Sequence, residues 1–220
     1  MDCPRCGNTG QIIERGPGLL ELHVYECPCM KQRRSLRSLR KAGMADMARR
    51  CTLENYLADN DHRKAVKTAA LRYLESPEGW FFIAGRSGSG KTHICTAICT
   101  ALITGHRAEV CYVSWRDKAT ELKGYYSEPE KYQAEVKKLK SVQVLYIDDF
   151  FKGGASDADL RLAFVILNAR YNDTALRTII SSEKSLEEIT ALDEALGSRI
   201  KERCKGFLVK SPPENWRLRS

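Results

Sequence analysis

The chain has 220 residues, of which 43% are hydrophobic, so it can form one medium-sized globular domain with a small additional module. Its apolar stretches are far shorter than the roughly 20 residues of a membrane span, and its polar N-terminus does not resemble a secretion signal. We therefore expect a soluble, unexported protein without a membrane partner. Its nine cysteines are then metal ligands or reduced thiols, and its net charge of +8 favours a polyanion partner or serves solubility.

The first thirty residues contain two pairs of cysteines. Cys3 and Cys6 form a CxxC knuckle, and Cys27 and Cys29 form a CxC pair after the stretches QIIER, GPG and ELHVYE, which are typical of a hairpin. Four thiolates complete a closed tetrahedral zinc site, which is structural because no ligand position stays open. Free thiols, or His23 in place of one cysteine, are the alternatives. The spacing predicts a small, four-cysteine, zinc-ribbon-like module whose folding depends on the metal.

A strongly basic segment follows at residues 31–50. Leucines and methionines repeat there at helical spacing, with a break near Gly43. Such a helix presents a solvated face or docks to a partner protein or DNA. Residues 51–62 are polar, without periodicity, and indicate an irregular linker that leads into a helix at residues 63–76.

The strongest motif in the chain lies next. An apolar strand at residues 80–84 runs into the pattern G-x4-G-K-T and then into a helix. Glycines allow backbone N–H groups to surround phosphates, and the helix N-terminus favours the same anion. Lys91 is expected to reach the β and γ phosphates, and the Thr92 hydroxyl is expected to ligate Mg²⁺. The predicted nucleotide-binding residues are Gly85, Arg86, Ser87, Gly88, Ser89, Gly90, Lys91, Thr92 and His93.

The stretch VLYIDD is a buried-type strand that ends on Asp148 and Asp149. Taken alone, this pair is an acidic strand end. A phosphate-binding loop, however, needs a carboxylate at the end of a neighbouring parallel strand to hold the metal. Asp148 is therefore predicted to bind Mg²⁺ together with Thr92, and Asp149 to orient or deprotonate the attacking water.

Further short apolar strands are expected at residues 108–114, 177–182 and 206–210, separated by helical stretches. Five strands that alternate with helices predict an α/β fold, in which a mostly parallel sheet is covered on both faces and binds its ligand at the carboxyl ends of the strands. An additional strand between the strand before the phosphate loop and the strand ending in Asp148 indicates the AAA+/RecA-like class.

At this point the chain resembles the DnaC/DnaI-type replicative helicase loaders and their IstB-like relatives, a branch of the AAA+ ATPases close to the DnaA initiator. The resemblance rests on GRSGSGKTHI, VLYIDDFFKGG, NARYND, RTIISSEKSLEEI and DEALGSRIKERC, in this order, and covers roughly residues 50–217. The cysteine-bearing segment is similar to the zinc modules of DnaI-type loaders from Gram-positive bacteria and their phages. The implied organisation is a zinc module with a basic docking helix at residues 1–50 and an AAA+ domain without a C-terminal lid at residues 51–220.

The resemblance also assigns roles to single residues. Gly85 to Thr92 match the Walker A loop, and Asp148 with Asp149 match the Walker B pair. Arg199 matches the arginine finger, which in an oligomer reaches the ATP of a neighbouring subunit; alternatively it is a surface arginine paired with Glu194 or Glu202. The γ-phosphate sensor, often asparagine in the family, and a second sensing arginine match less clearly. Candidates are Ser182 and Glu183 for the first, and Arg203 and Arg217 for the second.

Residues 115–140 form a basic helical insertion. In the family that the chain resembles, the matching region faces the pore of the oligomer and contacts single-stranded DNA. Aromatic rings next to lysines offer stacking surfaces and phosphate partners, although aromatic residues on helices more often pack internally. The candidate DNA contacts are Trp115, Lys118, Lys123, Tyr125 and Tyr126.

The resemblance implies an ATP-dependent replication protein that loads a ring-shaped DnaB-type helicase onto single-stranded DNA. It would use ATP, Mg²⁺ and structural Zn²⁺, self-associate through its AAA+ domain when ATP is bound, and work in the cytoplasm of a bacterium or a phage-infected host. An IstB-like transposition ATPase and a non-hydrolysing zinc/ATP adaptor are the alternatives. Because Asp149 is shorter than glutamate and Glu183 stands at the sensor position, we expect slow hydrolysis.

Overall fold

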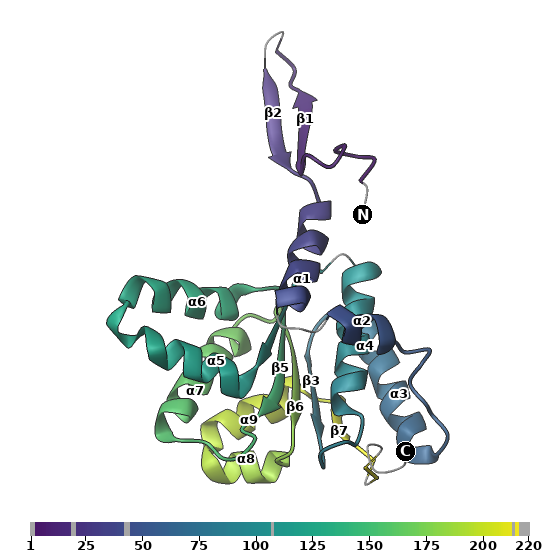
Figure 1. The fold of residues 1–220 in the computed structure, drawn as a ribbon, viewed down its shortest axis with the longest axis vertical. Helices are drawn as coiled ribbons and strands as arrows, with labels where there is room; N and C mark the ends of the chain where they lie inside the picture. The colour runs from purple at the N-terminus through teal and green to yellow at the C-terminus, as the bar shows by residue number, and fades with distance from the viewer. Residues whose placement is uncertain (1–2, 19–20, 42–44, 107, 213, 216–220) are drawn as a thin grey trace.

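The computed structural model describes residues 3–18, 21–41, 45–106, 108–212 and 214–215 (Figure 1). Most of these residues belong to helices and to two separate β-sheets. In chain order the elements are β1 (Gln11–Arg15), β2 (Leu22–Glu26), α1 (Cys29–Lys41), α2 (Ala45–Arg50), α3 (Asp61–Glu75), β3 (Trp80–Ala84), α4 (Lys91–Thr104), β4 (Val110–Ser114), α5 (Trp115–Gly124), the short 3₁₀ helix η1 (Tyr125–Ser127), α6 (Pro129–Ser141), β5 (Val144–Phe150), α7 (Asp157–Tyr171), β6 (Arg177–Ser182), α8 (Leu186–Leu192), α9 (Glu194–Arg203) and β7 (Leu208–Lys210).

The larger sheet has five parallel strands in the order β4-β5-β6-β3-β7. The predicted parallel five-stranded fold is therefore confirmed, and β6 is the additional strand that separates β3 from β5. Strands β4 and β7 each begin two residues later than expected, at Val110 and Leu208. Because β3 and β5 run in the same direction, their carboxyl ends lie at the same edge of the sheet.

Helices cover both faces of this sheet (Figure 1). On one face, Ile94 and Ile98 of α4 pack with Val66 of α3 and with Phe81 of β3. On the other face, Ile166 of α7, Leu122 of α5 and Ile200 of α9 form the second cluster together with strand residues. Strands covered on both sides carry apolar residues at nearly every position, which explains the unbroken apolar runs in the sequence. None of the described helices is both long enough and apolar enough to cross a bilayer.

The buried arginine Arg170 joins α7 to the start of β6 and to the segment before β5. Its guanidinium donates to the Thr178 hydroxyl at 3.0 Å and to the carbonyl oxygens of Val142 at 2.8 Å and Arg177 at 2.7 Å. A further bond reaches the Leu139 carbonyl at 3.0 Å. Burial lowers the pKa of Arg170 to about 10, so the side chain stays charged at neutral pH. It therefore bonds to carbonyl oxygens in the last turn of α6, at the C-cap of α6 and at the start of β6, and joins these segments.

The two-stranded sheet β1–β2 is antiparallel and projects away from the rest of the molecule (Figure 1). Helix α1 connects it to the larger sheet, where the buried Ser35 hydroxyl accepts from Val110 N–H at 2.9 Å and donates to Ala108 O at 3.1 Å. The basic segment thus forms α1 and α2, which pack against β4 and α4, while residues 42–44, where a break was expected, lie outside the described residues. The domain boundary at residue 50 stays a prediction.

Candidate functional site

The loop between β3 and α4 lies at the carboxyl ends of the strands. Gly85 has a φ of +151°, and a Cβ there would lie 1.9 Å from the Ser211 hydroxyl oxygen; Gly90, directly before α4, has a φ of +90°. Both positions therefore need glycine. The Lys91 ammonium donates to the carbonyl oxygens of Gly85 at 2.7 Å and Arg86 at 2.8 Å, so it lies folded back over the loop. The loop and the α4 N-terminus together have the form of an anion site.

Asp148 lies at the carboxyl end of β5, next to the loop, with only 6% of its surface exposed. One carboxylate oxygen accepts from Thr92 Oγ1 at 3.3 Å and from the Ser181 hydroxyl, and the other accepts from the Tyr112 hydroxyl at 3.3 Å. Burial, followed by the Asp148 charge, raises the pKa of Tyr112 and keeps it a donor. Hydroxyl and carboxylate oxygens from Thr92 and Asp148 are ligands that Mg²⁺ prefers, so the residues present fit this metal.

Asp149 occupies an irregular position in β5. The pairing of β5 with β6 shifts between Ile147 and Phe150, and Asp149 adopts a φ of +52°, which is uncommon outside glycine. The stacked, buried Phe150 and Phe151 rings, 3.9 Å apart, fix the backbone that follows it. The bulge turns the Asp149 side chain to Lys152 at 3.0 Å, and Asp149 N–H donates to Ser181 Oγ at 3.2 Å.

The residues at the end of β6 correct one sensor candidate. The Ser182 hydroxyl is buried, donates to Phe150 O at 2.7 Å and accepts from Lys184 N–H at 3.0 Å, so both its donor and an acceptor position are used by the backbone, which argues against a sensor role. Glu183, the next residue, forms an ion pair with Lys152 at 3.2 Å. Burial lowers the pKa of Lys91, and the charges of Glu183, Asp149 and Asp148 oppose this shift. The negative charge of Glu183 therefore acts on Lys91, the lysine that follows the phosphate loop.

Arg203, a candidate for the second sensing arginine, lies at the amino ends of the strands, opposite the phosphate loop. Its guanidinium donates to the carbonyl oxygens of Thr174 at 3.0 Å and Leu176 at 3.5 Å, just before β6 begins, and lies over the Trp80 ring. Because the phosphate loop is at the carboxyl ends of the strands, this position corrects the assignment of Arg203 as a sensor within its own subunit. Arg217 lies outside the described residues.

Arg199 is held by residues of its own chain on the surface of α9. It donates to Asn168 Oδ1 at 2.8 Å and to Ala195 O at 2.7 Å, and its guanidinium lies over the rings of Phe164 and Tyr171. These contacts replace the local pairing with Glu194 or Glu202 that was the alternative expectation. Its role as an arginine finger stays a prediction.

A cavity of about 260 Å³ adjoins the phosphate loop, and sequence reasoning missed most of its lining. The segment expected to be a simple linker packs here: Tyr56 is buried and contacts the His93 ring edge-on at 5.4 Å, while a His93 ring nitrogen lies 3.1 Å from Thr52 O. Burial raises the pKa of Tyr56 to about 12. The large side chains of Leu53, Tyr56 and Leu57 within the otherwise polar residues 51–62 could have indicated that this segment packs against the domain. The lining residues are Asn55, Tyr56, Leu57, Arg63, Ser89, Gly90 and His93.

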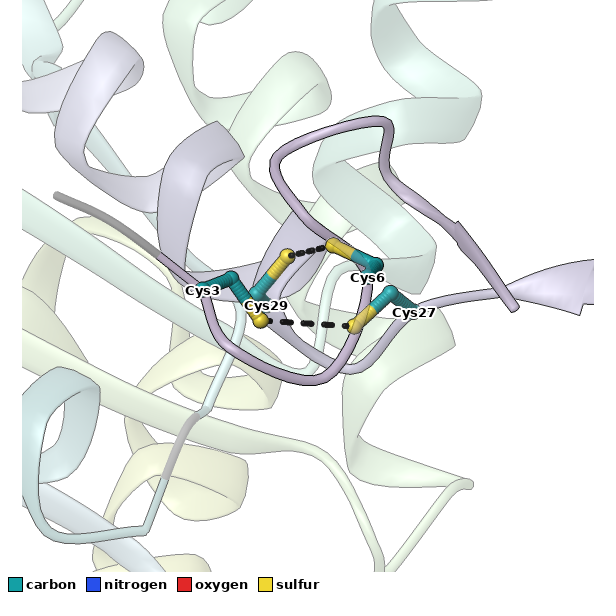
Figure 2. A group of neighbouring side chains, drawn as sticks. All are labelled: Cys3, Cys6, Cys27 and Cys29. Atoms are coloured by element: carbon teal, nitrogen blue, oxygen red, sulfur yellow. Dashed lines mark hydrogen bonds between the residues drawn. The ribbon is translucent and has the colours of Figure 1, made fainter.

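The two cysteine pairs meet at the base of the β1–β2 hairpin (Figure 2). The sulfur of Cys3 lies 3.8 Å from that of Cys27, and the sulfur of Cys6 lies 3.6 Å from that of Cys29. All four sulfurs lie within 4.8 Å of one another. Tetrahedral bonds of about 2.3 Å to one zinc ion place sulfurs about 3.8 Å apart, so the group fits this metal. His23 is outside the group and pairs with Glu21 at 3.6 Å.

Burial and ion pairing change the expectation for the DNA contacts. Trp115 is 4% exposed and packs edge-on against Phe150 and Phe151, which corrects its assignment as a stacking surface. Lys118 pairs with Glu121 and Glu135, Lys123 pairs with Asp159, and the Tyr125 hydroxyl donates to Glu121. Of the five candidates, Tyr126 has the most accessible ring, with 66% of its surface exposed.

Comparison with known proteins decides the family. Residues 18–219 match the family model described as IstB-like ATP binding protein. The chain belongs to this family. It is 32% identical over 234 residues to the phage-like element PBSX protein XkdC of Bacillus subtilis (strain 168), an alignment that covers 94% of this chain and 81% of XkdC.

Two further comparisons confirm the resemblance expected from the motifs. The replicative helicase loader DnaC of Buchnera aphidicola (subsp. Schizaphis graminum, strain Sg) is 28% identical over 202 residues, covering 87% of this chain and 77% of that protein. A crystal structure of the DnaC helicase loader matches with a TM-score of 0.63 at 21% identity, over 74% of this chain and 97% of the other. The IstB-like chain therefore shares the AAA+ fold of that loader.

Proposed function

We propose that this IstB-like chain is an AAA+ ATPase that loads a DnaB-type replicative helicase onto single-stranded DNA, in the cytoplasm of a bacterium or a phage-infected host. The observation that carries the ATPase proposal is the meeting of Lys91, Thr92 and Asp148 at the carboxyl ends of parallel strands, where Thr92 Oγ1 lies 3.3 Å from the Asp148 carboxylate. Similarity to DnaC loaders supports the helicase as partner.

Nucleotide binding would use the phosphate loop and the neighbouring cavity together. Lys91, which now contacts the Gly85 and Arg86 carbonyl oxygens, would exchange these for phosphate oxygens. The adenine base of ATP would enter the cavity beside Tyr56 and His93. Thr92 and Asp148 would hold Mg²⁺, which neutralises phosphate charge when bound.

In the hydrolysis step, Asp149 would orient a water molecule toward the γ-phosphorus. The water oxygen bonds to phosphorus as the bond to the β–γ bridging oxygen breaks, ADP leaves with the electron pair, and the water proton passes to Asp149 or to the released phosphate. Arg199 of a neighbouring subunit would neutralise developing charge when ATP-bound subunits associate. The short Asp149 side chain favours slow turnover.

The cysteine module would bind one structural zinc ion and, with α1, contact the helicase. Single-stranded DNA would lie along the α5–α6 insertion, where Tyr126 offers an exposed ring and the pairing of Lys118 and Lys123 weakens their part in phosphate contact. Within the same family, a transposition ATPase acting on duplex DNA is the alternative. ATP-dependent preference for duplex over single-stranded DNA would favour it.

The decisive experiment measures ATP hydrolysis by the full chain with helicase and single-stranded DNA present. Lys91→Ala and Asp148→Asn should each reduce turnover at least about 100-fold, because each removes a charged group from the phosphate or metal site. Lys64→Ala, which removes an exposed lysine paired with Asp61 on α3, away from the proposed DNA surface, is the matched control. Unchanged turnover in both site variants would contradict the ATPase proposal. If the unaltered chain binds ATP but does not hydrolyse it, the non-hydrolysing adaptor is favoured.

A further inference from the structure

Lys152 lies in the tight turn that follows β5, and two carboxylates hold its ammonium group. Its backbone N–H donates to Asp149 O at 3.1 Å, which places the lysine directly beside the Asp149 side chain. The ammonium lies 3.0 Å from Asp149 Oδ2 and 3.2 Å from Glu183 Oε1. It therefore bridges the ends of β5 and β6, the two strands that supply the acidic residues of the proposed site.

The local charge explains why a cation is needed here. Burial lowers the pKa of Lys91, while the negative charges of Glu183, Asp149 and Asp148 raise it, so three carboxylates lie near the ammonium group that is proposed to contact the phosphates. A nucleoside triphosphate adds several negative charges to the same space, and repulsion between like charges at short range opposes its binding. A carboxylate at the Glu183 position accepts hydrogen bonds and donates none, so it cannot hold a phosphate oxygen itself. It can, however, hold a lysine that does.

We propose that Lys152 is the group that distinguishes ATP from ADP, with Glu183 as its anchor. When ATP binds, the Lys152 ammonium moves from Asp149 to a γ-phosphate oxygen and keeps its contact with Glu183. Asp149 is thereby released to orient water, so the same movement that recognises the γ-phosphate prepares the site for hydrolysis. With ADP bound, Lys152 stays on Asp149. This inference rests on the proposed binding of ATP at the phosphate loop.

The side chain has the freedom that this movement requires. The Lys152 side chain is 41% exposed, and its partners Asp149 and Glu183 are 37% and 32% exposed, so neither ion pair is locked inside the core. A lysine stem can rotate to a second acceptor without backbone movement. Lys152 also acts electrostatically on Lys91, which places it within range of the group proposed to contact the same phosphates.

The test measures dissociation constants of the full chain for ADP and for the non-hydrolysable analogue AMPPCP, both with Mg²⁺, by calorimetry. For Lys152→Ala, AMPPCP affinity should fall about tenfold, or about 1.4 kcal/mol, while ADP affinity changes less than about twofold. Lys131→Ala is the matched control, because Lys131 forms the same kind of i,i+3 ion pair, with Glu128 at 3.4 Å, on the distant α6 helix. It should change neither affinity.

Charge exchange tests the role of Glu183 as anchor. Glu183→Gln should weaken AMPPCP binding by about threefold, since the lysine loses one of its two ionic partners. The double variant Lys152→Glu with Glu183→Lys returns an ammonium to the same place from the neighbouring strand, and it should recover most of the preference for AMPPCP over ADP. A double variant as impaired as Lys152→Glu alone would contradict the pairing.

Other outcomes separate this inference from the proposed function. If Lys152→Ala raises ATP turnover and leaves the AMPPCP to ADP preference unchanged, the lysine only restrains Asp149 and the inference is overturned. Equal losses for both nucleotides overturn it as well. If the unaltered chain binds neither nucleotide, the proposed function itself fails. If the unaltered chain binds both AMPPCP and ADP, and Lys91→Ala abolishes this binding, the proposed nucleotide site is supported regardless of the result for Lys152.

Discussion

The cysteine module and the sheet domain differ in how much apolar surface each one buries. In the module, the buried cluster consists of Cys6, Ile12 and Cys27, while Ile13, Leu22 and Val24 on the hairpin remain mostly exposed. In the sheet domain, helices on both faces bury extended clusters of aliphatic and aromatic side chains. A hairpin with so small a core is at best marginally stable in water.

This difference separates two sources of folding free energy. With zinc bound at the four cysteines, as we propose, the module would fold through metal–thiolate bonds, whereas the sheet domain folds through apolar burial and paired buried polar groups. Helix α1 belongs to both parts, because it begins at Cys29 and is bonded to β4 through Ser35. Conditions that remove the metal should therefore act on the module first, and α1 marks where the effect stops.

Loss of the metal site should have the largest effect. Structural zinc contributes about 10–16 kcal/mol in zinc-finger peptides at neutral pH, so Cys27→Ser or a chelator should unfold the module (residues 3–18 and 21–28 of the described chain) while nucleotide affinity stays within about twofold. Acidification should act in the same direction, because ligating thiols must be deprotonated. Metal content and limited proteolysis of the full chain measure this. Cys51→Ser, a cysteine outside the cluster, is the control, and a protease-resistant module after chelation would contradict the comparison.

Removal of Arg170 should have the next largest effect, confined to the sheet domain. Arg170→Met removes a buried guanidinium that donates to several carbonyl oxygens, and we expect a loss of about 3 kcal/mol or more in the free energy of unfolding. Urea unfolding measures it, while metal content should not change. Arg161→Met, on the exposed side of the same helix, should cost little. A loss under about 1 kcal/mol for Arg170→Met would show that water replaces the guanidinium.

Ser35→Ala tests the link between the two parts. The substitution removes a buried hydroxyl that satisfies both Val110 N–H and Ala108 O, so unfolding should become easier by about 1–3 kcal/mol. Hydrogen exchange in α1 and urea unfolding measure it. Ser141→Ala is matched, because the Ser141 hydroxyl lies 2.9 Å from the carbonyl oxygen four residues earlier, as the Ser35 hydroxyl does from Lys31 O, but Ser141 is exposed. Equal effects of the two substitutions would remove Ser35 as the link.

The smallest effect is expected for Arg34→Ala. Arg34 pairs with Glu109 at 3.0 Å and also with Glu26, and because all three side chains are partly exposed, each pair contributes about 0–1 kcal/mol. The loss should shrink further at high salt because ions screen the pair. Urea unfolding at two salt concentrations measures this, with Arg49→Ala as an exposed control. A loss larger than that of Ser35→Ala would mean that charge, and not the buried hydroxyl, holds α1 in place.

Local patterns predicted what depends on neighbours in the chain. The strand at residues 80–84 and the glycine-rich loop were readable because apolar runs and required glycines are local features. Contacts between distant segments were not readable in the same way. Trp115 is an aromatic residue in a basic stretch and was therefore expected to stack on DNA bases, yet it packs against Phe150 and Phe151. Tyr56 lies in a stretch that reads as a linker, yet His93 in the first turn of α4 packs against its ring.

The sequence by itself determined the parallel α/β fold, the phosphate loop, the carboxylates at the end of β5 and the cysteine spacing, since each depends on residue type and short separation. Only the tertiary structure decided which side chains from distant segments lie in contact with one another. Ser182 turned to the backbone and Arg203 to the opposite edge of the sheet, while Lys152 came to lie between Asp149 and Glu183. Side-chain direction at strand ends depends on bulges and neighbouring strands, which residue spacing does not encode.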